Sequence, residues 1–100
     1  MSGGFFEYNN YRLEYMADDL RQKIALCRKN PENEDYSEAF ICELIKTHDK
    51  LRELSVILYR IDMVLSGDSG EEHFLEIVAE EMKKIEYYDP TDDERYINRV

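Results

Sequence analysis

The fold of this chain is decided by the stretch Leu54-Ser55-Val56-Ile57-Leu58-Tyr59-Arg60-Ile61-Asp62-Met63-Val64-Leu65. Its apolar residues point to almost every side of a helix, whereas a helix at the surface of a small domain needs one apolar stripe. A chain with three main helices can supply only part of the cover that this segment requires. We therefore expect the rest of the cover to come from a second copy of the chain or from another partner.

Apolar residues at helical spacing before and after this stretch predict an all-α fold. We expect a three-helix bundle with a long central helix, a short C-terminal helix and an oligomeric assembly. One hundred residues make one domain. Within residues 1–100 the predicted segments are an aromatic lead over 1–8, helices over 9–29, 37–66 and 70–87, and a short helix or tail over 91–100.

Each main helix has one predicted core stripe, and each predicted helix begins at a residue type that caps helices well. The stripe of the first helix comprises Leu13, Met16, Ala17, Leu20, Ile24 and Cys27. The stripe of the central helix comprises Phe40, Leu44, Leu51, Leu58 and Leu65. The stripe of the third helix comprises Phe74, Ile77, Val78, Met82 and Ile85. The expected caps are Asn9 or Asn10, Ser37, Ser69 and Thr91.

The net charge of −10 narrows the classes of partner. Twenty-three acidic side chains against thirteen Lys and Arg create a field that repels DNA, RNA and anionic lipid. Direct binding of nucleic acid is therefore not expected. The sequence shows no signal peptide and no run of ~18 apolar residues that could span a membrane. We expect a cytoplasmic protein that does not bind membranes.

Neither catalysis nor metal binding is indicated by the motifs. Cys27 and Cys42 lack CxxC spacing, so we expect buried thiols rather than a disulfide or a zinc site. His48 and His73 have no His or Cys neighbour at the spacing of metal ligands. No cofactor motif is present, and no nucleophile with its base can be named. We therefore expect that the protein is not an enzyme and takes no cofactor.

Two helix faces are candidates for an interface, because aromatic and aliphatic side chains gather there away from the core stripes. On the first helix, Tyr15 and Leu26 lie nearly opposite the core stripe, together with Tyr11. On the central helix, the additional apolar residues are Ile57, Tyr59, Ile61 and Val64. Tyrosine offers a large contact area with a hydrogen-bonding tip, which suits interfaces and ligand stacking. The alternative is that half-exposed tyrosines pack on the aromatic lead.

Asp62 is a carboxylate on the core stripe of the central helix, where burial without a partner is costly. It can be satisfied by pairing with Arg12 or Arg60, or by holding the lead at Ser2-Gly3-Gly4. It can instead contact a bound ligand. The sequence leaves these alternatives open.

Acidic residues dominate the third helix and the turn before it. The turn over residues 66–72 contains two glycines and three acidic side chains, which argue against a bound phosphate and favour a simple connection between helices. Glu72, Glu76 and Glu80 lie on one face of the third helix. That face is either a solvated surface or an imitation of a phosphate backbone.

The opening run Ser2-Gly3-Gly4-Phe5-Phe6-Glu7-Tyr8-Asn9-Asn10-Tyr11-Arg12 resembles the N-terminus of a group of small, largely uncharacterised phage and prophage proteins. The later run Asp62-Met63-Val64-Leu65-Ser66-Gly67-Asp68-Ser69-Gly70-Glu71-Glu72, with Phe74, is similar to the second block that the group shares. Met63 stands where many of these proteins carry Trp. The two blocks cover about a quarter of the chain. The resemblance implies a phage accessory protein, and small acidic helical phage proteins often resemble anti-defence factors.

Two modes of action follow from that resemblance, both in the cytoplasm of a host cell. In the first, a homo-oligomer sequesters a small nucleotide-like immune signal, with Arg on a phosphate, Tyr stacked on a base and Asp on a ribose or base edge. The expected ligand-binding residues are Gly3, Gly4, Phe5, Phe6, Tyr8, Tyr11, Arg12 and Asp62. In the alternative, the chain is an acidic inhibitor, a nucleic-acid mimic that binds a host defence protein directly.

Overall fold

The computed structural model describes residues 6, 9–30 and 36–97 of the chain. Within that part the backbone forms helices and no strand. The elements, in chain order, are α1 (Asn10–Lys29), α2 (Glu38–Leu65), α3 (Glu71–Met82), the 3-10 turn η1 (Pro90–Asp92) and α4 (Asp93–Ile97). The predicted all-α class, the long central helix and the short C-terminal helix are confirmed.

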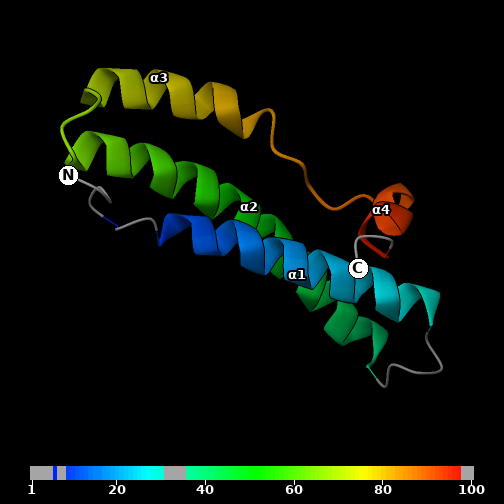
Figure 1. Cartoon of the computed structure of the whole chain (residues 1–100). Helices are drawn as coiled ribbons and strands as arrows, with labels where there is room; N and C mark the ends of the chain where they lie inside the picture. The colour runs from blue at the N-terminus through cyan, green and yellow to red at the C-terminus, as the bar shows by residue number, and fades with distance from the viewer. Residues whose placement is uncertain (1–5, 7–8, 31–35, 98–100) are drawn as a thin grey trace.

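The helices form an elongated arrangement around α2 (Figure 1). α1 packs antiparallel along α2, and α3 folds back along the C-terminal half of α2. An extended segment then carries the chain from the end of α3 to α4, which packs on α1. The radius of gyration is 16.1 Å, against about 13 Å for a compact domain of this length. A single copy therefore leaves much of its helix surface without a covering layer.

The ends of α2 follow ordinary helix chemistry. The side chain of Ser37 accepts a hydrogen bond from the backbone N–H of Phe40 at 3.2 Å, which confirms Ser37 as the cap. At the other end, Gly67 has a φ of +81°, a conformation that side chains with a Cβ rarely adopt. The backbone N–H groups of Asp68 and Ser69 then donate to the carbonyl of Met63. This closes α2 and reverses the chain into α3.

Three of the predicted caps are corrected by the structure. Asn9 precedes α1 but makes no capping bond through its side chain. α3 begins after Gly70 rather than at Ser69, because the backbone of Ser69 is already held by the C-terminal turn of α2. Asp89, not Thr91, caps the C-terminal turn, since its carboxylate accepts hydrogen bonds from the backbone N–H and the hydroxyl of Thr91.

The third helix is shorter than predicted, because it ends at Met82 instead of near residue 87. Beyond Lys84 the chain runs extended to Asp89. The extended path lets the backbone N–H of Tyr88 donate to the Asp49 carboxylate at 2.8 Å and brings the Tyr88 ring against α1. These contacts outweigh the helical pattern that Ile85 continues.

The buried core is smaller and more polar than the stripes predict. Its apolar members are Ala17, Ile24, Ala25, Cys27 and Tyr96, and its polar members are Arg21, His48 and Ser55. On α1, Met16 is 51% exposed. On α2, the predicted stripe is exposed at both ends and half-buried between them, while His48 and Ser55 are the buried side chains of that helix. The predicted stripe of α2 is therefore not the core of a single copy.

The two cysteines differ in solvent exposure. Cys27 is buried and Cys42 is exposed, and no disulfide joins them. The expectation of a buried thiol is confirmed for Cys27 and wrong for Cys42, which lies on a side of α2 that no other described element covers.

The stripe residues that are not buried lie on one side of the α1–α2 pair. At about 100° per residue, Met16 and Leu20 are on the flank of α1 opposite Arg21 and Ala25. Arg21 faces the C-terminal segment, since it contacts Asp93. The flank that carries Met16 and Leu20 therefore points away from that segment.

The same reasoning applies to α2. The C-terminal segment contacts Asp49 and Glu53, and the leucine flank of α2 is on the opposite side of the helix axis. No described element lies over this side of the α1–α2 pair, which we call the open face. It comprises Leu13, Met16, Leu20, Leu51, Leu54 and Leu58, all half-buried or exposed.

Candidate functional site

The predicted ligand residues that the structure describes lie near one end of the α1–α2 pair. Asp62 accepts a hydrogen bond from the backbone N–H of Phe6 at 3.4 Å and another from the Ser66 hydroxyl at 3.1 Å. The rings of Tyr11 and Tyr59 are 6.5 Å apart at an angle of 57°. Two elements and the lead thus meet at this point, which we call the tyrosine end.

The hydrogen bonds of Asp62 agree with the alternative in which this carboxylate holds the lead. Arg12 is exposed and makes no ion pair within the described part of the chain. Gly3, Gly4, Phe5 and Tyr8 lie outside the described residues, so the predicted ligand site is placed only in part.

The predicted interface residues do not form one surface. Tyr15 is 67% exposed on α1, and Leu26 is half-buried near the other end of that helix. Tyr59 contacts Tyr11, and Ile57 is half-buried on α2. The two remaining residues, Ile61 and Val64, face α3 at the end of α2.

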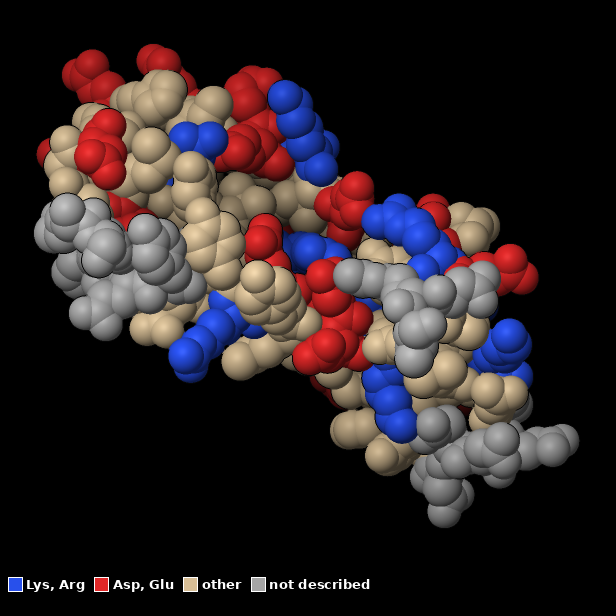
Figure 2. Space-filling view, in the orientation of Figure 1, with Lys and Arg blue, Asp and Glu red and all other residues tan. Residues whose placement is uncertain are grey.

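Ile61 and Val64 form part of an open groove between α2 and α3. The groove has a volume of about 270 Å³ and is lined by Ile61, Val64, Leu65, Glu71, Phe74 and Leu75. Leu65 and Leu75 are 54% and 68% exposed. On the side seen in Figure 2, acidic side chains gather over α3. An apolar surface is therefore open to solvent beside a strongly negative helix.

The strongest polar constellation is one that the sequence analysis missed. Arg21 is 1% exposed, and its Nη2 lies 2.8 Å from Asp93 Oδ1 and 2.6 Å from the carbonyl oxygen of Asp89. Its guanidinium also lies over the rings of Tyr88 and Tyr96, with distances of 4.6 and 4.7 Å to the ring centroids. This one side chain attaches the C-terminal segment to α1.

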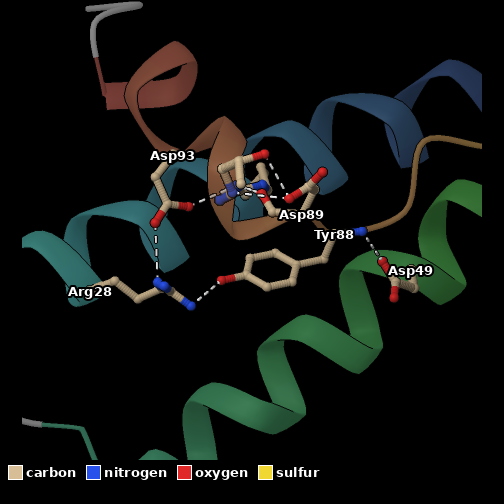
Figure 3. Close-up of polar contacts among 7 residues, drawn as sticks. Arg28, Asp49, Tyr88, Asp89 and Asp93 are labelled. Atoms are coloured by element: carbon tan, nitrogen blue, oxygen red, sulfur yellow. Dashed lines mark hydrogen bonds and ion pairs between the residues drawn. The ribbon is translucent and has the colours of Figure 1, made fainter.

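Tyr88 connects the same segment to both long helices (Figure 3). Its hydroxyl accepts a hydrogen bond from Arg28 Nη1 at 2.6 Å, and its backbone N–H donates to Asp49. Arg28 Nε lies 3.1 Å from Asp93 Oδ2. Burial raises the pKa of the Tyr88 hydroxyl, so the phenol stays neutral at physiological pH.

A signal for Arg21 is present in the sequence. Arg21 lies four residues after Ala17 and three before Ile24, so it occupies the core stripe of α1. A charged residue in that register predicts a buried ion pair. Its partners are 68 and 72 positions further along the chain, and no local pattern identifies them.

His48 is the buried titratable group of α2. Its Nδ1 lies 3.0 Å from Asp49 Oδ1, and its Nε2 has no hydrogen-bond partner among the described residues. A carboxylate accepts hydrogen bonds, so the neutral ring carries its proton on Nδ1. Burial lowers the pKa of His48, and the hydrogen bond to Asp49 only partly opposes that effect.

Polar contacts also attach α3 and the extended segment to α2. Arg60 Nε donates to Glu81 Oε1, and this bond lowers the pKa of the Glu81 carboxyl. The hydroxyl of Tyr87 donates to Glu53 at 2.7 Å, which raises the pKa of Tyr87. These contacts are at the surface and position the elements; none resembles a catalytic group with its base.

Among the described residues, no group of three His, Cys, Asp or Glu side chains is arranged to hold a metal ion. No helix in the same part of the chain is long and apolar enough to cross a membrane. Comparison of the chain with models of protein families, with curated proteins and with solved structures finds no match.

Proposed function

We propose that this protein is a non-enzymatic binding protein whose working form is a homo-oligomer built through the open face. The observation that carries the proposal is that the apolar side chains of the open face have no described element over them in one copy. Met16 and Leu54 are 51% and 46% exposed, and the other members of the open face are half-buried. Burial of apolar surface contributes about 25 cal/mol per Å², so leaving such a face in water is unfavourable.

A second copy suits this face for two reasons. Leu51, Leu54 and Leu58 follow the 3, 4 spacing by which helices pair along an apolar seam. Two copies related by a two-fold axis would bring the same apolar residues together, which gives a self-complementary contact. The pair would then be a four-helix layer with α1 and α2 from each copy.

The proposed cargo is a small nucleotide-like anion at the tyrosine end. Tyr11 offers a ring for a base, and the exposed guanidinium of Arg12 is available to a phosphate. Asp62 would act there mainly through the lead that it holds. The resemblance to phage proteins supports the setting that we propose, the sequestration of an immune signal in the host cytoplasm.

The assembly is tested by sedimentation velocity on the whole chain at several concentrations. We expect a mass above that of one chain, which falls to one chain in Met16→Glu and Leu54→Glu. Both positions are exposed enough for the substituted helices to fold. Leu75→Glu is the matched control, because it places the same charge on an exposed leucine outside the open face and should leave the mass unchanged.

The salt dependence of the sedimenting mass is an independent test of the same assembly. Each copy carries a charge of −10, so the copies repel each other and added salt should strengthen their association. A parent chain that sediments as one copy at all concentrations and salt conditions would exclude this proposal.

The cargo is tested separately by native mass spectrometry of the protein taken directly from cells and by titration with mononucleotides and cyclic dinucleotides. We expect one of these classes to bind and Arg12→Ala to weaken binding about tenfold, which corresponds to about 1.4 kcal/mol. If no nucleotide binds the intact oligomer, the cargo is wrong while the assembly stands.

A further inference from the structure

From the groove between α2 and α3 we infer a docking site for a basic amphipathic helix of a partner protein. The groove lies at the end of α2, beyond the open face, and is lined by residues of both helices. Leu75 is 68% exposed at its edge, and no other described element lies over it. This inference does not depend on the proposed homo-oligomer.

The size and shape of the groove favour a helix over a small molecule. Sites for small molecules usually enclose ~300–1,000 Å³ and bury most of their ligand. This groove holds about 270 Å³ and is open to solvent. It can accept one or two large apolar side chains that project from one face of a helix, as in helix-in-groove recognition.

The charge around the groove specifies the polar face of that helix. Residues 61–82 contain no Lys or Arg. Their acidic residues are Asp62, Asp68, Glu71, Glu72, Glu76, Glu80 and Glu81. Glu81 pairs with Arg60 and Glu80 lies 3.4 Å from Lys83, whereas Glu71, Glu72 and Glu76 are exposed and make no ion pair within the described part of the chain.

Charge therefore selects between the possible occupants. A helix with Lys and Arg beside its apolar face would meet Glu71 at the groove, on a chain whose net charge is −10. An acidic helix, including the acidic regions of a second copy, would bring like charges together.

The test uses three synthetic helical peptides of equal length, measured by fluorescence anisotropy with the whole chain. The first carries an apolar face and Lys and Arg on its polar face. The second keeps the apolar face and replaces Lys and Arg with Glu. The third has the composition of the first in a scrambled order with no apolar face. We expect the first peptide to bind at least tenfold more tightly than either of the others.

Variants then locate the site. Leu75→Ser should weaken the first peptide about tenfold, because it removes an exposed apolar contact without opening the core. Glu71→Gln should weaken it about threefold at low salt and less at high salt. The matched controls are Met16→Ser on the open face and Glu94→Gln on α4, which should both leave peptide binding unchanged.

Three results would overturn the inference. One is equal affinity for the basic and the acidic amphipathic peptides. Another is equal affinity for the basic amphipathic peptide and its scrambled form, which would mean that net charge alone causes the binding. The third is a Leu75→Ser chain that keeps full peptide affinity but loses self-association in sedimentation. That result would assign the groove to a second copy.

Discussion

On one side of the α1–α2 pair the C-terminal segment covers Arg21 and binds Asp49, whereas on the other side the open face leaves Met16 and Leu54 in contact with water. The covered side buries charge and aromatic rings, and the uncovered side exposes apolar chains. Folded proteins usually show the reverse distribution. The contrast shows that long-range polar contacts complete one side within a single copy, while no described element lies over the apolar side chains of the other.

The covered side should be the more sensitive to substitution, and Arg21 should show the largest effect. Arg21→Met removes the buried guanidinium and leaves Asp93 with only its half-exposed partner Arg28, so we expect a loss of about 3–5 kcal/mol in the free energy of unfolding. Urea denaturation followed by circular dichroism measures it. Lys50→Met is the control, because Lys50 is exposed on α2 and makes no ion pair within the described residues.

A double variant separates lost charge pairing from lost packing. If the loss of the Arg21–Asp93 ion pair causes the damage, Asp93→Asn should cost less in the Arg21→Met chain than in the parent. If the Arg21→Met chain were as stable as the parent, the covered side would not be more sensitive to substitution than the open face, and the comparison would be wrong.

Two residues of one predicted stripe should differ in the same experiment. Ile24 is fully buried, so Ile24→Ala should cost about 2–5 kcal/mol. Met16 is on the open face, and Met16→Ala should cost less than about 1 kcal/mol in the single copy. The comparison is made at a concentration where light scattering reports one chain. Equal costs would mean that the open face is covered in the single copy after all.

The helices themselves could be predicted from the sequence, because apolar spacing and the Ser37 cap act over a few residues. The positions of α1 and α2 were close to those observed for that reason. The burial of each stripe could not be predicted, since it depends on which neighbour lies over it. Met16 and Ile24 satisfy the same helical pattern and differ only in what covers them.

The candidate site was less predictable than the fold. A carboxylate in an apolar stripe requires a donor, and one of the alternatives was that Asp62 holds the lead at Ser2-Gly3-Gly4. Those residues lie outside the described part of the chain, and the donor that the structure shows is the backbone N–H of Phe6. The groove was not predicted, since it exists only where the turn at Gly67 sets α3 beside α2. The Arg21 contacts depend on residues 68 and 72 positions away, whose approach follows from the early end of α3.

The smallest expected effect concerns pH and again belongs to the covered side. His48 is 1% exposed, and burial lowers its pKa from the ordinary 6.5 in spite of its hydrogen bond to Asp49. The guanidinium groups of Arg52 and Arg21 act in the same direction as burial. In the unfolded chain the ring takes up a proton as the pH falls through about 6.5, while in the folded chain it resists protonation. The unfolded state therefore binds more protons, and the free energy of unfolding decreases as the pH falls from neutrality toward the lowered folded-state pKa.

The free energy of unfolding should not decrease above the pKa that His48 has in the unfolded chain. The decrease should level off below the pKa that His48 has in the folded chain. His48→Gln keeps a hydrogen-bond donor near Asp49 but does not titrate, so its stability should be flat over this range. The lowered pKa values of Asp89 and Glu81 act at more acidic pH and stay outside the window. Urea denaturation at several pH values between about 7.5 and 5.5 compares the two chains, around the unperturbed histidine pKa. Parallel pH profiles would show that the His48 ring is open to protonation, and the covered side would then be less closed than its burial indicates.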